Sequence, residues 1–403
     1  MTQASRDDVD RILANMNGIL RLEPAWVGRD FLPPGRRLGL HPAEYELGER
    51  GSICERWLAS TTHADNNLGP DDEGLSYLSV EGGPCICLRD VIALDPTAVM
   101  GAEYASTHHS LGRLAKLFDY GARLPYHIHP RLSEARLVGC NPKEEAYYFL
   151  TDVDLGPHPE AFFGVHPSLA ERSDRDEVLL PYLVDWDSDL ILRHSRAEYQ
   201  VPGDGFHIPA GILHAPGTAL TFELQEESDA MLMFQALNAG KIISKELLFK
   251  NVHAERRQKM GERAALEWID WDANGDPYFY ENHHIDNMIV DGSQQAHGHE
   301  EWLFGGTSKF SGKRLVVDGR ATYRSADKGV YGVFAWRGQG IFGGVELRSG
   351  EPGLDELLVC HDRATRPLDI FNTGREQLIL FKFFGPEIND YVPRVAQTCP
   401  AGQ

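Results

Sequence analysis

The stretch LPYHIHPRLSEARLVGCNPKEEAYYFL, residues 124–150, places His127 and His129 one residue apart between two prolines. Alternate side chains of a strand share one face, so both imidazoles point to the same side. A second stretch, GDGFHIPAGILHA (203–215), delivers His214 from another segment bounded by Gly and Pro. Neutral imidazoles that meet at the mouth of a β-barrel make a site for a divalent transition metal. The two stretches therefore predict a β-barrel with three histidines at one metal site.

The spacings in these two stretches match two known motifs. The pattern that runs from Gly121 to His127 and His129 is the opening of the first cupin motif. The pattern from Gly203 to His214, with Pro-Ala-Gly before the histidine, reproduces the second cupin motif without a gap. Both motifs occur in one chain and in the expected order. This agreement predicts a cupin, which is a jelly-roll β-barrel.

One carboxylate is needed to complete the metal site, and two glutamates compete for that position. Glu134 has a permitted spacing after His129, but PRLSEARL resembles a short helical turn. Glu145 lies in KEEAYYFL, a β-prone run in which it shares a strand face with Lys143. We favour Glu145 and keep Glu134 as the alternative. Glu144 is expected to point away from the site, although a slip of one residue in register would exchange it with Glu145.

The chain outside these motifs is organised as strands, helix and strands. Residues 1–24 contain an amphipathic helix over 5–20, and 25–240 form the metal-binding cupin domain. Residues 241–275 carry a polar, highly charged helical pattern and are expected to form a helical connector. Strand signals return over 276–403. The predicted fold is mainly β, a bicupin of two jelly-roll β-barrel domains with a few helices.

The second β unit is expected to be a degenerate cupin that is mainly structural. The stretch 328–344 reads as a strand pair, and 355–374 resembles a second motif containing His361 and Asn372. The matching pair of histidines is absent. His297 and His299 are able to bind metal by themselves, but no partner strand follows them, so we expect them at the surface or a pocket rim. The unit is expected to pack on the first cupin or to mediate a homodimer.

Composition excludes several classes of partner. The formal charge of −21 disfavours nucleic acid and anionic lipid, which are bound mainly through Lys and Arg. No apolar run is long enough to span a membrane, and the first residues lack the layout of a signal peptide, so a cytoplasmic location is expected. The six cysteines are too few for a disulfide scaffold in 403 residues, and reduced thiols are expected.

The chain resembles the type I mannose-6-phosphate isomerases, a family of zinc-dependent cupins. The resemblance rests on Lys116-Leu-Phe-Asp, LPYHIHP (124–130), Lys143-Glu-Glu145 and PAGILHA (209–215). Smaller similarities occur in the same order at CERWLAS (54–60), EAFFGV (160–165) and FELQEESDA (222–230). The resemblance covers about residues 50–235 and is most specific from 114 to 233.

The resemblance implies both a metal site and a sugar pocket. The implied metal ligands are His127, His129, Glu145 and His214. They would hold one divalent metal, with zinc as the first expectation and manganese, iron or nickel as alternatives. The implied pocket residues are Lys116, Lys143 and Glu223.

Two departures from the family pattern bear on the chemistry. The family usually has Gln at the position of His127, so this site becomes three His and one Glu, a set typical of many iron, manganese and nickel cupins. Met233 stands where an active-site Arg is expected in bacterial members. A missing cation removes a group that would stabilise developing negative charge.

The sequence thus predicts a metal-dependent aldose–ketose isomerase that acts on a sugar or sugar phosphate. Lys143, Glu223 and Lys116 are the candidate catalytic residues. No Gly-rich phosphate loop is present, so a phosphate would have to be held by isolated cations, of which the candidates are Arg123, Arg131, Lys116 and Lys143. A cupin dioxygenase and a non-catalytic sugar-binding or metal-binding bicupin are the alternative functions.

Overall fold

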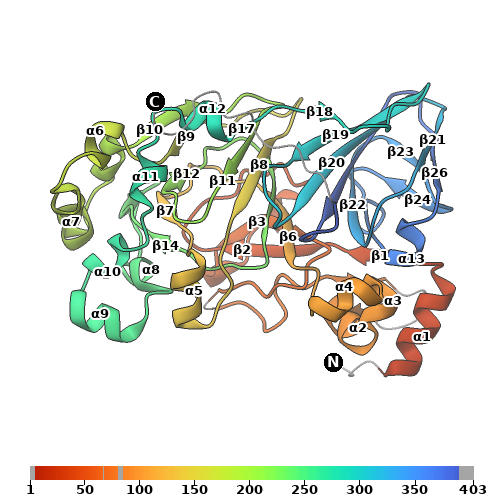
Figure 1. The fold of residues 1–403 in the computed structure, drawn as a ribbon, viewed down its shortest axis with the longest axis horizontal. Coiled ribbons are helices and arrows are strands. Elements are labelled where there is room, and N and C mark those ends of the chain that lie inside the picture. The colour runs from red at the N-terminus through yellow and green to blue at the C-terminus, as the bar shows by residue number, and fades with distance from the viewer. Residues whose placement is uncertain (1–4, 67, 80–84, 390–403) are drawn as a thin grey trace.

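A computed structural model describes residues 5–66, 68–79 and 85–389. Two β-barrels lie side by side along the longest axis of the molecule (Figure 1). We call the barrel that contains most of the first half of the chain the N-terminal barrel, and the other the C-terminal barrel. Both consist of antiparallel sheets, and the mainly β class predicted from sequence is confirmed.

The N-terminal barrel is built from a seven-stranded and a five-stranded sheet. The seven-stranded sheet has the order β17 (His284–Ile285), β11 (Gly205–Ile208), β8 (Glu145–Phe149), β13 (Thr221–Glu226), β6 (Arg113–Phe118), β3 (Ser52–Leu58) and β2 (Ala25–Arg29). The five-stranded sheet has the order β10 (Arg196–Tyr199), β9 (Glu160–Phe163), β12 (His214–Ala215), β7 (His127–Ile128) and β14 (Leu232–Met233). The two histidine motifs lie next to each other on β7 and β12.

The C-terminal barrel is built from a nine-stranded and a four-stranded sheet. The nine-stranded sheet has the order β18 (Met288–Ile289), β19 (Gly298–Phe304), β20 (Ser311–Val317), β27 (Leu378–Phe384), β22 (Tyr331–Arg337), β25 (Glu356–Val359), β1 (Ile19–Glu23), β4 (Tyr77–Leu78) and β5 (Ile86–Cys87). The four-stranded sheet has the order β21 (Thr322–Ser325), β26 (Leu368–Asn372), β23 (Gln339–Phe342) and β24 (Val345–Arg348). A separate hairpin pairs β15 (Leu237–Asn238) with β16 (Lys241–Ile242).

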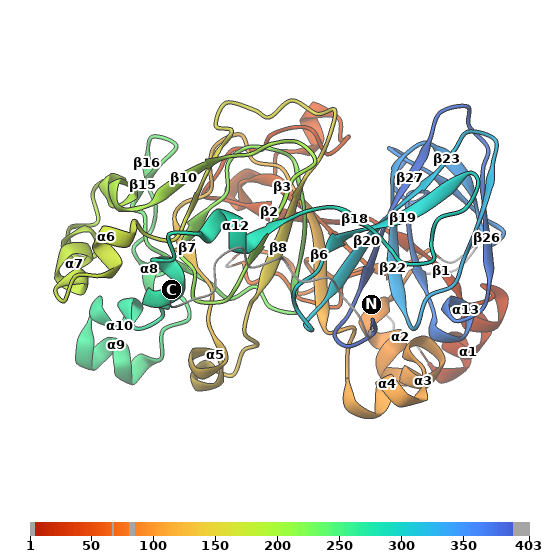
Figure 2. The same ribbon diagram turned by 45° about the horizontal axis from the view of Figure 1, so that its top comes forward.

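Helices gather at the two ends of the molecule (Figures 1 and 2). Near the C-terminal barrel lie α1 (Arg6–Asn15), α2 (Leu88–Leu94), α3 (Pro96–Met100), α4 (Ala102–Thr107) and α13 (His361–Ala364). At the opposite end lie α6 (Pro167–Ala170), α7 (Arg175–Asp185), α8 (Glu246–Phe249), α9 (Ala254–Met260), α10 (Arg263–Leu266) and α11 (Trp271–Asn274). Along the N-terminal barrel lie α5 (Leu132–Val138) and α12 (Phe279–His283).

The seven-stranded sheet separates two chemically different spaces. On β13, Phe222 and Leu224 belong to the apolar core shared with the C-terminal barrel, and Phe222 stacks on Phe381 with ring centroids 4.9 Å apart. Glu223, between them, lines a cavity of the N-terminal barrel. Because strand side chains alternate, one face of β6, β8 and β13 contributes apolar residues to this shared core, while Lys116, Glu145 and Glu223 on the other face line the first barrel's interior. This explains why these strands are buried along their whole length.

The N-terminal helix is shorter than predicted. The sequence pattern predicts a helix over 5–20, but α1 ends at Asn15. Asn17 and Gly18 adopt the left-handed conformation (φ 47° and 71°), which stops a helix. The apolar residues that extended the helical pattern belong to β1, which pairs with β25 and β4 of the C-terminal barrel.

The expected connector over 241–275 contains β16 and the helices α8 to α11. The sheets do not follow the predicted domain boundaries strictly, because β1, β4 and β5 from the first ninety residues join the C-terminal barrel. The boundaries at 24, 240 and 275 stay predictions. Among the described residues, none of the helices has the length and apolar character needed to cross a bilayer.

Candidate metal centre

Three histidines converge inside the N-terminal barrel. His214 on β12 lies directly opposite His127 on β7, and His129 follows one residue beyond that strand. The Nδ1 atom of each ring lies 2.7–2.9 Å from a backbone carbonyl oxygen. Those carbonyls belong to Pro125, Ala230 and Ile212. A carbonyl only accepts, so Nδ1 carries the proton, and in the neutral rings the Nε2 lone pairs are available for a ligand bond.

Glu145 meets the histidines from the opposite sheet. Its Oε1 lies 2.9 Å from His214 Nε2, and its Oε2 lies 3.1 Å from His129 Nε2. The four possible ligand atoms of His127, His129, Glu145 and His214 lie within 4.8 Å of one another. The cluster is buried, and Glu145 Oε2 and His214 Nε2 have no hydrogen-bond partner. Acceptors that face one another in a dry interior fit a bound cation.

The electrostatics of the cluster favour the form that binds metal. Burial lowers the pKa of His129 to about 3 and holds the pKa of His127 well below its ordinary value. Burial alone would raise the pKa of Glu145, but the charge of Lys143 and the neighbouring histidines hold it well below its usual range. Neutral imidazoles with an ionised carboxylate are ligands that divalent transition metals accept.

The other two candidate glutamates lie outside the cluster. Glu134 is on α5, the helical turn expected from PRLSEARL, and forms an ion pair with Arg131 at 3.1 Å. Glu144 points away from the site and lies 2.9 Å from His207 Nε2. Glu145 is therefore the carboxylate that the fold brings to the histidines.

The three predicted catalytic residues form a connected row beside the cluster. Lys143 Nζ lies 3.0 Å from both Glu145 Oε2 and His129 Nε2. Glu223 on β13 is paired in register with Lys116 on β6, and Lys116 Nζ lies 3.3 Å from Glu223 Oε2. Its other oxygen, Oε1, is 3.8 Å from Lys143 Nζ and has no hydrogen bond. Burial raises the pKa of Glu223 to about 8 despite these lysines.

Several neighbours of this row were not assigned a role from the sequence. Glu55 on β3 lies 3.8 Å from Lys116 Nζ and accepts a hydrogen bond of 2.8 Å from Arg29 Nε. Arg29 is also 3.1 Å from Asp229, and the Tyr147 hydroxyl donates to Glu145 Oε1. The E-x-W spacing of 55–57 could have pointed to Glu55. It puts Glu55 and Trp57 on one strand face, where Trp57 donates a hydrogen bond to Glu55.

The remaining sequence candidates do not join the cluster. Arg123 and Arg131, considered as phosphate ligands, are ion-paired with Glu160 and Glu134. In the C-terminal barrel, His361 begins α13, and Asn372 Nδ2 donates to backbone carbonyls. The other two histidines considered there, His297 and His299, lie 3.9 Å from Asp318 and 2.8 Å from Glu301. Within the described part of the chain, the set around His127 is the one group with the geometry of a metal site.

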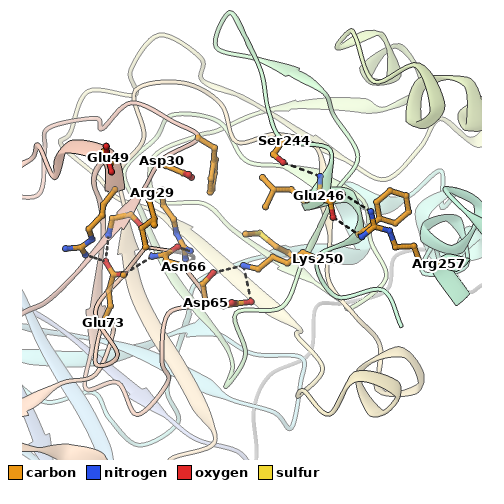
Figure 3. Close-up of a pocket in the computed structure, with 18 residues that line it drawn as sticks. Arg29, Asp30, Glu49, Asp65, Asn66, Glu73, Ser244, Glu246, Lys250 and Arg257 are labelled. Atoms are coloured by element: carbon orange, nitrogen blue, oxygen red, sulfur yellow. Dashed lines mark hydrogen bonds and ion pairs between the residues drawn. The ribbon is translucent and has the colours of Figure 1, made fainter. Parts of the chain in front are cut away.

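Two neighbouring cavities lie at and near the cluster. The inner cavity, of about 30 Å³, is lined by the predicted metal ligands His127, His129 and Glu145 and by the buried Met233, and it has room for very few small atoms. The outer cavity, of about 350 Å³, opens beside α8 and α9 (Figure 3). Arg29, Phe31 and Met231 line both cavities, so the two cavities are adjacent.

Comparison with solved structures places the fold among mannosephosphate isomerases. A candidate mannosephosphate isomerase from Archaeoglobus fulgidus has a TM-score of 0.61 at 15% identity, covering 91% of this chain and 97% of that chain. Mannose 6-phosphate isomerase from Bacillus subtilis has a TM-score of 0.60 at 18% identity, covering 90% and 99%. An alanine mutant of phosphomannose isomerase from Salmonella typhimurium has a TM-score of 0.60 at 12% identity, covering 92% and 100%.

No family model and no curated protein sequence matches the chain. At identities of 12–18% the likeness establishes the fold. The chain therefore has the fold of these isomerases over nearly its whole length, which extends the sequence resemblance beyond residues 50–235.

Proposed function

We propose that the protein is a metal-dependent aldose–ketose isomerase acting on a sugar or sugar phosphate. One observation carries the proposal: a buried cluster of three neutral imidazoles and one carboxylate lies beside Lys143 and Glu223, at the floor of a cavity. The isomerase fold of the structural neighbours supports the same reaction class.

His127, His129, Glu145 and His214 would hold one divalent metal, with zinc as the first candidate and manganese, iron or nickel as alternatives. When bound, the metal would supply Lewis acidity that polarises the sugar carbonyl. The unpartnered oxygen and nitrogen atoms of Glu145 and His214 support this assignment, because a bound cation would satisfy both.

The chain's own residues would move the proton. Isomerisation takes a proton from the carbon next to the carbonyl and returns one to the former carbonyl carbon, while the proton of the neighbouring hydroxyl is transferred to the former carbonyl oxygen. Glu223 is suited to this transfer because its unpartnered Oε1 lines the inner cavity and its pKa lies near neutral pH. Lys143 would donate to the oxygen on which negative charge develops, and Lys116 would hold Glu223 in place.

The test is NMR of the zinc-loaded protein with a panel of aldoses in D2O. Ketose formation with deuterium entering at C1 or C2 is expected. Glu223→Gln should lower kcat by about a hundredfold or more while zinc content is unchanged. Glu226→Gln is the matched control, because that carboxylate lies on the same strand but pairs with Lys309. Full turnover in Glu223→Gln would remove Glu223 from the mechanism.

Two rival functions predict other outcomes. The donor set of three histidines and one glutamate also suits a cupin dioxygenase, for which oxygen consumption with iron and no aldose turnover would be found. A non-catalytic bicupin would bind sugar without proton exchange. A cytoplasmic location, a homodimer and the absence of nucleic-acid and membrane partners stay predictions.

A further inference from the structure

The charges of the outer cavity identify the class of sugar. We propose that the site takes an uncharged sugar in preference to a sugar phosphate. This inference rests on the proposed function for the existence of a sugar site, and it goes beyond it by choosing the substrate class. The inference depends on which carboxylates already form ion pairs with the cations of the cavity.

Every cation that lines the outer cavity is paired with a carboxylate, and Figure 3 shows this for Lys250 and Arg257. Arg50 lies 2.7 Å from Glu73, and Lys250 Nζ lies 3.1 Å from an oxygen of Asp65. The guanidinium of Arg257 makes two bonds of 2.8 Å to Glu246. The fourth cation is Arg29, whose buried guanidinium is held by Glu55 and Asp229. The charge of each of these lining cations is therefore already partly or fully neutralised.

The same cavity has acidic side chains in excess. Asp30 and Glu49 are exposed, line the cavity and make no ion pair with any described residue. A phosphate dianion would therefore enter a space that already carries more negative than positive charge. Like charges at short distance repel, and a phosphate would have to share each cation with the carboxylate that already binds it.

The lining suits an uncharged polyol. Phe31, Met231, Leu247 and Phe249 form an apolar part of the wall, against which the C–H faces of a sugar ring can pack. The carboxylates of Asp30 and Glu49 accept hydrogen bonds, and sugar hydroxyls can donate them. A volume of about 350 Å³ lies at the lower end of the range for small-molecule sites.

Binding of alditols tests the inference independently of turnover, because an alditol has no carbonyl and cannot be isomerised. The zinc-loaded protein is titrated with mannitol and with mannitol 1-phosphate by calorimetry. Mannitol is expected to bind at least about tenfold more tightly, which corresponds to little more than 1 kcal/mol of repulsion. Tighter binding of the phosphate, or no binding of either compound, would overturn the inference.

A single substitution should shift this preference. Glu246→Gln releases the guanidinium of Arg257 at the cavity wall, so the affinity for mannitol 1-phosphate relative to mannitol should rise by about three- to fivefold. Glu177→Gln is the matched control, since it releases Arg263 from a similarly exposed pair outside this cavity. An unchanged ratio in Glu246→Gln, or an equal rise in the control, counts against the inference.

The turnover assay separates the two hypotheses. If mannitol is preferred and no aldose undergoes proton exchange, the proposed function fails and the ligand class stands. If an aldose phosphate is isomerised faster than its parent aldose, the proposed function stands and the ligand class fails.

Discussion

The N-terminal barrel surrounds Glu145 with three histidines and Lys143, whereas the C-terminal barrel surrounds Lys382 with carboxylates. Lys382 Nζ lies 2.6 Å from Glu300 and 2.8 Å from Asp327, and Lys313 Nζ lies 2.7 Å from Asp327. Both groups are buried between two sheets of a barrel. They differ in hydrogen bonding, because the lysines and carboxylates of the second group have partners while Glu145, His214 and Glu223 keep unpartnered atoms.

This difference distinguishes a ligand-binding site from a structural ion-pair cluster in two similar barrels. A buried ion pair whose hydrogen bonds are all satisfied has no remaining capacity for a ligand, and it is weak evidence for function. Buried acceptors that face one another are costly unless something positive lies between them. Mutation of the first group should therefore reduce metal binding, whereas mutation of the second group should reduce the stability of the fold.

The largest expected effect is on the metal. His214→Ala should abolish metal binding and lower turnover by about a thousandfold or more, because a ligand is removed and several kcal/mol of transition-state stabilisation are lost with the metal. Metal analysis after dialysis and an aldose turnover assay measure both. His299→Ala in the C-terminal barrel is the control and should keep full metal content. Retained metal in His214→Ala would contradict the site.

The next largest effect is on stability. Lys382→Met leaves Glu300 and Asp327 with less neutralising charge in the interior, and the free energy of unfolding should fall by about 3–5 kcal/mol. Denaturant titration measures this loss, and metal content is measured on the folded variant. Metal binding should remain, because the substitution is confined to the C-terminal barrel. A variant as stable as the parent would show that the charged group is dispensable.

A smaller, pH-dependent effect is expected where the barrels meet. Arg56 on β3 binds both Asp355 and Glu356 near β25 at 2.7 and 2.9 Å, so one cation serves two carboxylates. Burial raises the pKa of Glu356 to about 7, although Arg56 opposes the shift. The folded state then binds more protons than the unfolded state between about pH 4.5 and 7. The contribution of this group to stability is present below pH 4.5, falls as the pH rises through that window and is flat above pH 7.

Thermal unfolding of the parent and of Glu356→Gln across pH 4.5–8 measures this contribution. The difference in unfolding free energy between the two proteins should change by a few kcal/mol over the window. The parent should lose stability relative to the variant as the pH rises. A constant difference would mean that Glu356 is ionised throughout.

The smallest expected effect comes from Glu134, the rejected carboxylate. Glu134→Ala should leave the metal content unchanged and cost at most about 1 kcal/mol of stability, since its partly exposed pair with Arg131 contributes little. Metal analysis of this variant beside Glu145→Ala compares the two glutamates directly. Loss of metal in Glu134→Ala would reverse their assignment.

Local spacing was sufficient to predict which residues meet at the cluster. The strand alternation of His127 and His129 and the face shared by Lys143 and Glu145 are period-two features, which the sequence displays directly. The helical turn that contains Glu134 could likewise be predicted from its neighbours in the sequence. The fold class followed from the two motifs in order.

Features that depend on distant partners were not predictable. The contact between Arg29, at the end of β2, and Asp229, in the loop between β13 and β14, joins segments two hundred residues apart. The helix over 5–20 was drawn too long because Ile19 and Leu20 continue its apolar pattern, and only their pairing with β25 shows that they form a strand. Over so few residues, a helical and a strand pattern of apolar side chains look alike, so tertiary contacts decide which of the two structures forms.

The position of β1 has a consequence for synthesis on the ribosome. This strand is translated more than three hundred residues before its partner β25. Until then, β1 can pair with β4 through Leu22, but Ile19 and Leu20 lack their partner strand, and this apolar strand edge is open to wrong pairing. The C-terminal barrel thus cannot be completed as an independent late domain.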